Sequence, residues 1–586
     1  MIAKESKWAF YFILIGIITG IGTIAFSYLC QLGVHIFMDI AAGYRPPVPA
    51  GEHHIFHMTD IPLNKWVLLF LPAMGGILSG FIVYKFAPEA EGHGTDAVIR
   101  SYHKEGGFVR ARVPYIKTIA SALTLTTGGS GGTEGPIAQI GSGFGAFLAT
   151  KFKLSVRERR IMLAAGMGAG IGSIFRTPMA GALFAAEILY KDPEFESEVI
   201  IPAGISSIVA YCIFCLQFGW GSLFQSPDFK FHNPLALGPY FVLAIVLVLF
   251  AILYIKSFYG ITGLFHKLKI PNYFKPAIGG LLTGIIGFFL PQTLSMGYGY
   301  AQQAILNQLS ISFLLYLAIG KIFTTAFSIG SGGSGGVFGP SIVIGGAVGG
   351  VIGNLFHLLM PTVVVNPGAF VIVGMAGFFA AVSNTPIATI ILVSEMTNSY
   401  HLLLPSLLVC SISYSLSPGW TIFKEQVKSK VDSPAHTGEF MVDVLQAIKV
   451  KDLIHRVKKV DVIPENMDFL EFKKFFCETK QHYFPVIDND KRLSGIFSST
   501  DVRGVLFSHD IEHLVIMKDI ATPDIISCNP SEDLHSVLQK FTKKNIDSLP
   551  VVNDNDSGIL IGMLNRRELI DFYNNQIKRL KAEALG

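Results

Sequence analysis

Charged residues are scarce in this chain of 586 residues, in which Asp, Glu, Lys and Arg together make up only 15%. Soluble domains usually contain about 25% charged residues, so this composition argues against a wholly soluble protein. The net charge of +4 is small for this length and does not indicate a nucleic-acid partner. Hydrophobic residues reach 51%, and much of the chain is therefore predicted to lie in lipid.

Cysteine is also rare, with six residues in the whole chain. Cys212 and Cys215 form a CxxC pair inside an apolar segment, where packing is a better explanation than redox chemistry or metal binding. The thiols Cys477 and Cys528 in the C-terminal tail favour a reducing, cytoplasmic side. No GxxxxGK phosphate loop, catalytic triad or metal-ligand set is evident in the sequence, so neither an enzyme nor a metal site is predicted.

Long apolar runs dominate the first three quarters of the chain. The run at residues 8–38 exceeds a signal-peptide core of roughly 7–15 residues and predicts a long, tilted membrane helix. Further apolar stretches cover residues 161–217 and 239–417. We therefore predict a membrane domain at residues 1–425 and a linker at 426–444, followed by a soluble tail.

An internal repeat divides the membrane domain. The run GSGG at residues 129–132 recurs at 333–336, and a Gly-Pro pair follows each copy at the same distance. Residues 166–187 also match residues 374–395 without a gap, including a shared Thr-Pro and a final Glu. Two halves derived from one ancestral unit explain this pattern.

The repeats, at about 66–217 and 275–417, predict two halves arranged around a site near the middle of the bilayer. Each GSGG run breaks a helix, and Pro136 and Pro340 suit the first turn of the helix that follows. Helix N-termini expose unpaired N–H groups and the positive end of a dipole, which favour an anion. The alternative is that these glycines only permit close helix packing.

At these residues the sequence resembles the CLC family of chloride channels and chloride/proton antiporters. The family motif GxEGP stands at residues 132–136 and GxFxP at 336–340, while GSGIP is only partly matched at 92–96. The resemblance implies an all-α polytopic membrane protein of two inverted-topology repeats with broken helices. It also implies a chloride-conducting homodimer with one pore per subunit, which spans the cell (inner) membrane several times.

Carried over by motif, Glu134 is the gate. A carboxylate beside the helix N-terminus at Pro136 would compete with chloride for the same N–H donors, until protonation or chloride displaces it. A structural salt bridge is the alternative for Glu134. Lys321 and Arg176 either raise the local anion concentration or anchor the membrane interface. The residues that the resemblance places around chloride are His93, Gly132, Glu134, Gly135, Val337, Phe338 and Phe423.

Three positions depart from the family pattern. Ile188 stands where exchangers usually have a proton-relaying glutamate, directly after Glu187, so this relay is lost. His93 replaces the pore serine, and Phe423 replaces the pore tyrosine. These changes favour a gated channel; a proton-coupled antiporter and a transporter of nitrate or another anion are the alternatives. His93 either donates to chloride and titrates near neutral pH, or turns away from the pore.

The tail resembles a pair of CBS domains, which many CLC proteins carry on the cytoplasmic side. The first is predicted at residues 445–510 and the second at 515–578, each with a strand–helix–strand–strand–helix pattern. Proline-centred strands, FPVID and LPVVN, are followed by GIFSSTD and GMLNRRE. The resemblance therefore adds two small α/β domains to the membrane domain.

Such pairs often bind adenine nucleotides, so ATP or another adenine nucleotide is the predicted regulator, and no cofactor is required. The resemblance assigns Thr500 and Asp501 to a nucleotide site in the first domain. In the second domain Glu568 takes the place of the acid and Asn565 that of the usual Ser or Thr. A purely structural role in dimerisation is the alternative for the tail.

Overall fold

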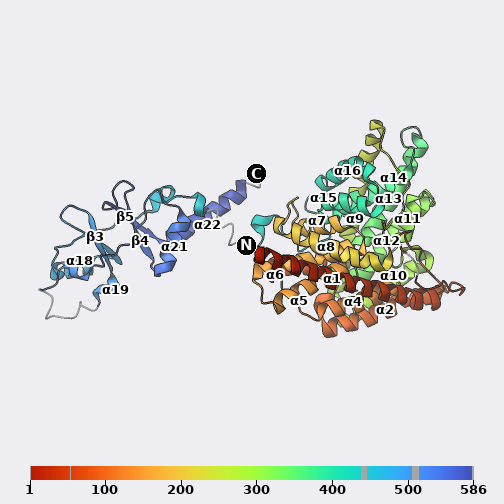
Figure 1. Ribbon diagram of the computed structural model, residues 1–586, viewed down its shortest axis with the longest axis horizontal. Coiled ribbons are helices and arrows are strands. Elements are labelled where there is room, and N and C mark those ends of the chain that lie inside the picture. Colours follow the sequence, from red (N-terminus) through yellow and green to blue (C-terminus); the bar gives the residue numbers. More distant parts are fainter. Residues whose placement is uncertain (1, 53–54, 437–444, 504–513, 584–586) are drawn as a thin grey trace. The chain divides into compact units, whose positions relative to one another are not determined.

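The protein forms two compact units, a helical one at Met1–Ala435 and one of helices and short strands at His436–Gly586 (Figure 1). In the computed structural model, the described residues are 2–52, 55–436, 445–503 and 514–583.

The first unit extends further along the chain than the sequence predicts. Residues 426–444 are predicted as a linker, but residues 426–435 pack within the first unit. The N–H group of Lys191 donates to the carbonyl oxygen of Val427 at 2.9 Å, in a short parallel pairing. Backbone pairing of this kind holds the segment in place, which composition alone does not reveal. Residues 437–444 lie outside the described residues.

Within the described part of the chain, six helical segments are long and apolar enough to cross a membrane. The first spans Lys7–Ile40 and consists of α1 (Ile2–Gly33) and its π-helical continuation η1 (Val34–Ile40). This bears out the single long helix predicted from the apolar run. The others are Lys65–Phe86, Ser197–Phe218, Pro234–Lys267, Ile311–Gly330 and Phe338–Leu359.

The helices of the two repeats correspond in order along the chain. The first repeat contains α2 (Lys65–Phe86), α3 (Thr95–Lys104), α4 (Val113–Thr126), α5 (Glu134–Lys151), α6 (Val156–Ile174), α7 (Pro178–Glu187) and α8 (Ser197–Phe218). After α9 (Leu237–Lys267), the second contains α10 (Lys275–Phe289), α11 (Tyr298–Ile305), α12 (Ile311–Gly330), α13 (Phe338–Leu359), α14 (Pro367–Ser383), α15 (Pro386–Thr397) and α16 (Leu403–Ser415). The pair α5–α6 packs together as its counterpart α13–α14 does, and α2 packs on α10.

The two GSGG runs meet in an antiparallel backbone bridge. The N–H of Gly132 donates to the Gly336 carbonyl oxygen at 2.8 Å, and the N–H of Gly336 donates to the Gly132 carbonyl oxygen at 2.7 Å. A Cβ atom on Gly132 would lie 2.8 Å from the backbone nitrogen of Gly339. Glycine is therefore required here because the repeats approach each other backbone to backbone, and they do so in opposite directions.

Two glutamates, Glu187 fully buried and Glu395 half-buried, each reach across to the other repeat. Glu187, at the end of α7, accepts hydrogen bonds from the N–H groups of Ile387 (3.2 Å) and Ala388 (2.7 Å) at the start of α15. Glu395, in α15, accepts one from the N–H of Ala180 (2.9 Å) at the start of α7. Each repeat thus satisfies exposed N–H groups at a broken helix of the other.

A buried lysine occupies the same place in each repeat. Lys117 in α4 donates to two backbone carbonyls of the loop before α3, including Gly92 at 2.7 Å. Lys321 in α12 donates to two carbonyls of the loop before α11, including Ser295 at 2.6 Å. Both lysines are fully buried, so interface anchoring is wrong for Lys321: its ammonium group holds a loop inside the protein.

The second unit contains two small α/β cores. The first has β1 (Ile463–Pro464), α18 (Phe469–Glu478), β2 (Tyr483–Ile487), β3 (Leu493–Ser498), α19 (Ser499–Val502) and α20 (Met517–Ile520). The second has α21 (Leu534–Lys544), β4 (Ser548–Val552), β5 (Leu560–Asn565) and α22 (Arg566–Glu583). Strand β2 pairs with β1 in parallel and with β3 antiparallel, and β4 pairs with β5 antiparallel.

The two cores exchange their leading segments. Leu453, from the chain before the first core, packs in the second core with Leu564. Met517, from the chain before the second core, packs in the first with Phe484. The predicted domains, 445–510 and 515–578, are continuous segments of the chain, whereas each core also contains side chains from the segment that precedes the other core. Apolar side chains pack with the core that lies beside them, whatever their position in the sequence.

Candidate functional site

The site lies where α5 and α13 begin, on either side of the Gly132–Gly336 bridge. Glu134 is the first residue of α5 and Phe338 the first residue of α13. Both helices start directly after a GSGG run, as predicted, with proline in the first turn. Glu134 is only 2% exposed, so its carboxyl group must find its partners inside the protein.

The Glu134 carboxylate occupies the N-terminus of the helix in the other repeat. One oxygen accepts a hydrogen bond from the N–H of Gly339 at 3.1 Å. The other accepts from the Thr133 hydroxyl at 3.1 Å and, at close range, from the Tyr298 hydroxyl. The sequence placed this carboxylate at its own helix, near Pro136, but the donor helix is α13, because the bridge brings its start beside Glu134.

Tyr298 is a site residue that the sequence reading missed. It is the first residue of α11 and follows Gly297, which has a φ of 83°. In the first repeat, Gly94 with a φ of 85° precedes α3 in the same way. Extending the repeat comparison to the segments GHGTDA and SMGYGY would have placed Tyr298 opposite Thr95 and drawn attention to it.

The start of α13 offers further donors for an anion. Val337 and Phe338 are buried, and no described residue accepts a hydrogen bond from either N–H group. Buried N–H groups normally have an acceptor, and a helix N-terminus is a favourable place for an anion to supply one. The Phe338 ring packs against Phe379, with ring centroids 4.0 Å apart, so this end of the helix is held firmly.

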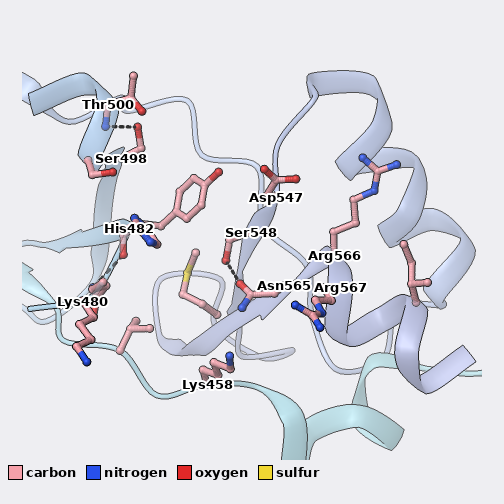
Figure 2. A pocket seen from close by; sticks show the side chains of 16 residues that line it. Lys458, Lys480, His482, Ser498, Thr500, Asp547, Ser548, Asn565, Arg566 and Arg567 are labelled. Carbon is pink, nitrogen blue, oxygen red and sulfur yellow. Dashed lines mark hydrogen bonds between the residues drawn. The ribbon is translucent and has the colours of Figure 1, made fainter. Parts of the chain in front are cut away.

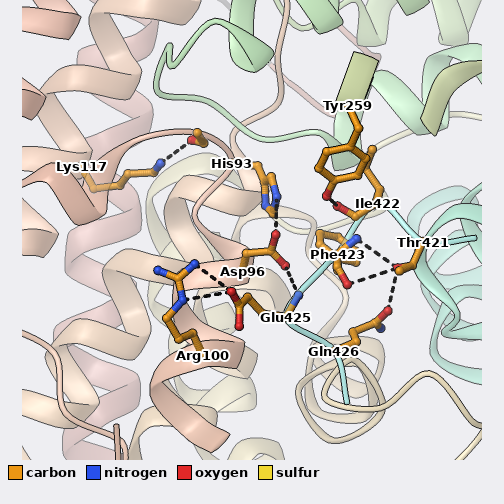
Figure 3. Close-up of polar contacts among 11 residues, drawn as sticks. His93, Asp96, Arg100, Lys117, Tyr259, Thr421, Ile422, Phe423, Glu425 and Gln426 are labelled. Carbon is orange, nitrogen blue, oxygen red and sulfur yellow. Dashed lines mark hydrogen bonds and ion pairs between the residues drawn. The ribbon is translucent and has the colours of Figure 1, made fainter. Parts of the chain in front are cut away.

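His93 and Phe423 lie side by side on another face of the site. Their ring centroids are 5.4 Å apart with the rings nearly perpendicular, and the His93 Nε2 atom lies 3.2 Å from Asp96 (Figure 3). The Nδ1 atom of His93 is buried and has no hydrogen-bond partner among the described residues. A Cβ atom on Gly135 would lie 2.1 Å from the His93 carbonyl oxygen, so this loop abuts the start of α5.

His93 lines a cavity of about 520 Å³ that also borders Phe258 and Gln139. A polar, roomy cavity of this size can hold water and hydrated ions. In a neutral ring whose Nε2–H donates to Asp96, Nδ1 is an acceptor, so Nδ1 would donate to an anion only when the imidazole is protonated. The residue is therefore placed to contact the cavity, while its pH response stays a prediction.

A chain of charged groups ties the Phe423 segment to α3. The Asp96 carboxylate accepts from the N–H of Glu425 at 3.2 Å, and the Glu425 carboxylate accepts from Arg100 at 2.9 Å (Figure 3). Lys104 also donates to the Glu425 carboxylate, at 2.8 Å. These contacts fix the chain directly after Phe423. The phenyl ring is therefore positioned by neighbours that the sequence did not single out.

The proton-relay position carries no titratable group. Ile188 is fully buried at the end of α7, and its carbonyl oxygen accepts a hydrogen bond from the Gln426 side chain at 3.0 Å. Glu187, the neighbouring carboxylate, is already engaged at the start of α15. Ile188 therefore has no side-chain group that could exchange a proton, and the Glu187 carboxylate serves to join α7 to α15.

A cavity of about 800 Å³ lies between the two cores of the tail (Figure 2). Thr500 and Ser498 line it from the first core, and Arg566 and Arg567 line it from the second. Further cationic or imidazole groups on its wall are Lys458, Lys480 and His482. A cavity with this excess of basic groups suits a polyanionic ligand.

The two acids predicted at nucleotide sites, Asp501 and Glu568, lie outside the lining of this cavity. Asp501 accepts from both the N–H and the hydroxyl of Ser498, in the capping box of α19. Glu568 lies 3.5 Å from Lys458 and 3.9 Å from Arg456. Of the three predicted nucleotide residues, only Thr500 faces the cavity, because the two acids are held by local partners.

Two protein-family models match the chain. The model described as voltage gated chloride channel matches residues 75–418, and the model described as CBS domain matches residues 450–508 and 517–575. The first match covers most of the helical unit, and the second covers both cores of the tail.

Named relatives and a solved structure agree with these matches. A putative chloride channel protein ClcB-like from Ralstonia nicotianae is 28% identical over 62% of this chain and 86% of its own length. The H(+)/Cl(−) exchange transporter ClcA of Vibrio parahaemolyticus is 30% identical over 59% of this chain and 76% of its own. The structure of a slow cyanobacterial Cl⁻/H⁺ antiporter is similar with a TM-score of 0.62 and 25% identity, covering 70% of this chain and 94% of that one.

Proposed function

Because the chain belongs to the voltage gated chloride channel family, as its motifs predicted, we propose that it is a gated chloride channel with Glu134 as the gate. The family membership accounts for chloride as the transported anion and for the several membrane-spanning helices. The fold of two inverted repeats with broken helices, followed by CBS domains, is confirmed. The channel mechanism and the gate are what we add.

The observation that carries the proposal is the position of the Glu134 carboxylate. It accepts a hydrogen bond from the N–H of Gly339 at the start of α13. The neighbouring N–H groups of Val337 and Phe338 have no acceptor among the described residues. A carboxylate and a chloride ion compete for such donors because both are anions. When Glu134 takes up a proton, its attraction to the helix start weakens and chloride can replace it.

A channel, rather than an antiporter, is favoured by Ile188. An antiporter must carry protons to the opposite side of the membrane from chloride, and an isoleucine side chain has no group that takes up a proton. Glu187 does not substitute for it, because its carboxylate holds the start of α15. Chloride would then pass down its own gradient, with Glu134 acting alone.

A proton-coupled antiporter is the second candidate, because a relative named H(+)/Cl(−) exchange transporter is 30% identical. The reversal potential of the purified protein in a planar bilayer separates the two. We expect no shift when a proton gradient is imposed at a fixed chloride gradient. A shift that follows the proton gradient would show coupling and would establish the antiporter instead.

For the tail, our proposal is regulation by ATP or another adenine nucleotide, bound in the cavity between the two cores. The basic groups around this cavity suit a triphosphate, and Thr500 supplies a hydroxyl from the first core. Thermal unfolding of the full-length protein tests this, because a ligand at 100 times its Kd stabilises by about 2.7 kcal/mol. ATP should raise the unfolding temperature of the tail, and GTP should not.

A matched pair of variants locates the nucleotide. Thr500→Ala should weaken protection by ATP, whereas Thr542→Ala on the surface of α21 should not, because the Thr542 hydroxyl donates to the Leu538 carbonyl of its own helix and Thr542 does not line the cavity. If neither nucleotide protects the wild type, a structural role in dimerisation becomes the better account of the tail. Cross-linking in native membranes would test the proposed homodimer, and protease accessibility the cytoplasmic placement of the tail.

A further inference from the structure

The loop that follows η1 is held by hydrogen bonds beside α11, the helix that begins with Tyr298. The N–H of Gly51 donates to the Leu223 carbonyl at 2.9 Å, and the N–H of Ala50 donates to the Gln302 side chain at 3.3 Å. The guanidinium of Arg176 donates to the Gly51 carbonyl at 2.7 Å. This loop therefore has a defined conformation and holds Glu52, its next residue, in a half-buried position.

Glu52 borders two small cavities, of about 60 and 50 Å³. The first also touches Tyr298, which donates a hydrogen bond to Glu134, and the second touches Thr133, which does the same. A water molecule needs roughly 10–15 Å³ of such volume, so each cavity has room for a few waters. Between Glu52 and Glu134 thus lie cavities that water can fill, and then Tyr298 and Thr133, each of which borders a cavity and donates to Glu134.

The Glu52 carboxyl group has no hydrogen-bond donor among the described residues. Burial raises the pKa of Glu52 to about 7, while the nearby charge of Arg176 opposes this rise. A group whose pKa is raised to this range exchanges protons readily near neutral pH. The titratable or charged residues that line these cavities beside Glu52 are Cys30, Arg45, Arg176 and Tyr298.

We infer that Glu52 is the proton donor to Glu134 on the side of the membrane where the loop between the first two spans lies. Protonated Glu52 gives its proton to a water in these cavities, that water gives a proton to the hydroxyl of Tyr298 or Thr133, and the hydroxyl releases its own proton to the Glu134 carboxylate. The O–H bond at Glu52 breaks, one forms at Glu134, and the Glu52 carboxylate regains a proton from the solution on the same side. This inference rests on the proposed role of Glu134 as the gate.

The test is the rate of channel opening after a step to acid on one side of a planar bilayer. Glu52→Gln removes the proton donor but keeps the shape of the side chain. A positioned proton donor contributes about 10²-fold or more to a transfer rate, so opening should slow by about 100-fold. The slowing should appear for acid on one side only, and the steady current at low pH should match the wild type, because protons then reach Glu134 slowly without help.

Asp60→Asn is the matched control, because Asp60 is an exposed carboxylate of the same loop that lines neither cavity. It changes the charge equally and should leave the opening rate unaltered. In a Glu134→Gln background, Glu52→Gln should have no further effect, because no carboxylate remains to accept the proton.

The outcomes separate this inference from the gate itself. If Glu52→Gln opens as fast as the wild type while Glu134→Gln no longer responds to pH, the inference about Glu52 is overturned and the gate stands. If Glu134→Gln responds to pH as the wild type does, both fall. Equal slowing by Glu52→Gln and Asp60→Asn would also overturn it, because surface charge alone would then explain the effect.

Discussion

Replacing Glu134 by glutamine tests the gate most directly. The amide keeps the size and shape of the side chain but carries no charge. Glu134 accepts hydrogen bonds from the Gly339 N–H and the Tyr298 hydroxyl. A hydrogen bond to a charged group contributes about 1.5–3 kcal/mol and a neutral one about 0.5–1.5 kcal/mol, so each bond weakens by about 1–1.5 kcal/mol.

Two such bonds together weaken the hold of the side chain at position 134 on these donors by about 2–3 kcal/mol. Chloride, which competes for the same donors, should then bind roughly 30- to 150-fold more tightly. The removed negative charge adds to this gain, because it no longer repels an ion at the start of α13. We therefore expect Glu134→Gln to bind chloride more tightly by at least about 30-fold. We also expect chloride flux that no longer depends on pH through this residue.

Chloride binding to the detergent-purified protein, measured by isothermal titration, gives the affinity. Chloride efflux from liposomes at several pH values gives the second readout, with Asp60→Asn as a control of equal charge. The reasoning is refuted if Glu134→Gln binds chloride no better than the wild type. It is also refuted if efflux through the variant keeps the pH profile of the wild type, since the titrating gate would then be another group.

Four further predictions concern residues around the gate. Glu187→Ala should lower the unfolding temperature in detergent, because each of the two N–H groups left buried without a partner costs about 1–3 kcal/mol. Glu187→Gln should lower it less, because its single amide oxygen can still accept one of the two hydrogen bonds. Lys321→Met should destabilise the protein for a similar reason, since the Ser295 carbonyl loses its donor and the Thr293 carbonyl keeps only the Thr324 hydroxyl among the described residues. Calorimetry that shows wild-type stability would contradict the role of Lys321 in holding this loop. His93→Ala should lose any acid-enhanced conduction in bilayer recordings, and an unchanged pH profile would show that the imidazole does not titrate at the pore. His93→Ser should alter the nitrate-to-chloride flux ratio in liposomes, and an unchanged ratio would show that this position does not select between the two anions.

The sequence alone determined the features that depend on local pattern. Apolar runs, glycine and proline predicted where helices break and begin, and α5 and α13 start where the GSGG runs end. The repeat and the motifs GxEGP and GxFxP identified the family and pointed to Glu134. These signals are readable because the start of a helix and the length of a membrane span depend on neighbouring residues.

Only the tertiary structure decided which partners these residues meet. Glu134 bonds Gly339, 205 residues away, and Tyr298, 164 residues away. The reciprocal use of Glu187 and Glu395 arises in the same way, from the opposed arrangement of the two repeats. The exchange of segments between the two cores of the tail and the position of Glu52 beside Tyr298 also depend on contacts between residues far apart in the sequence. The reason is physical: a buried polar group takes whichever donor the packing brings within about 3 Å, and packing joins residues without regard to their distance along the chain.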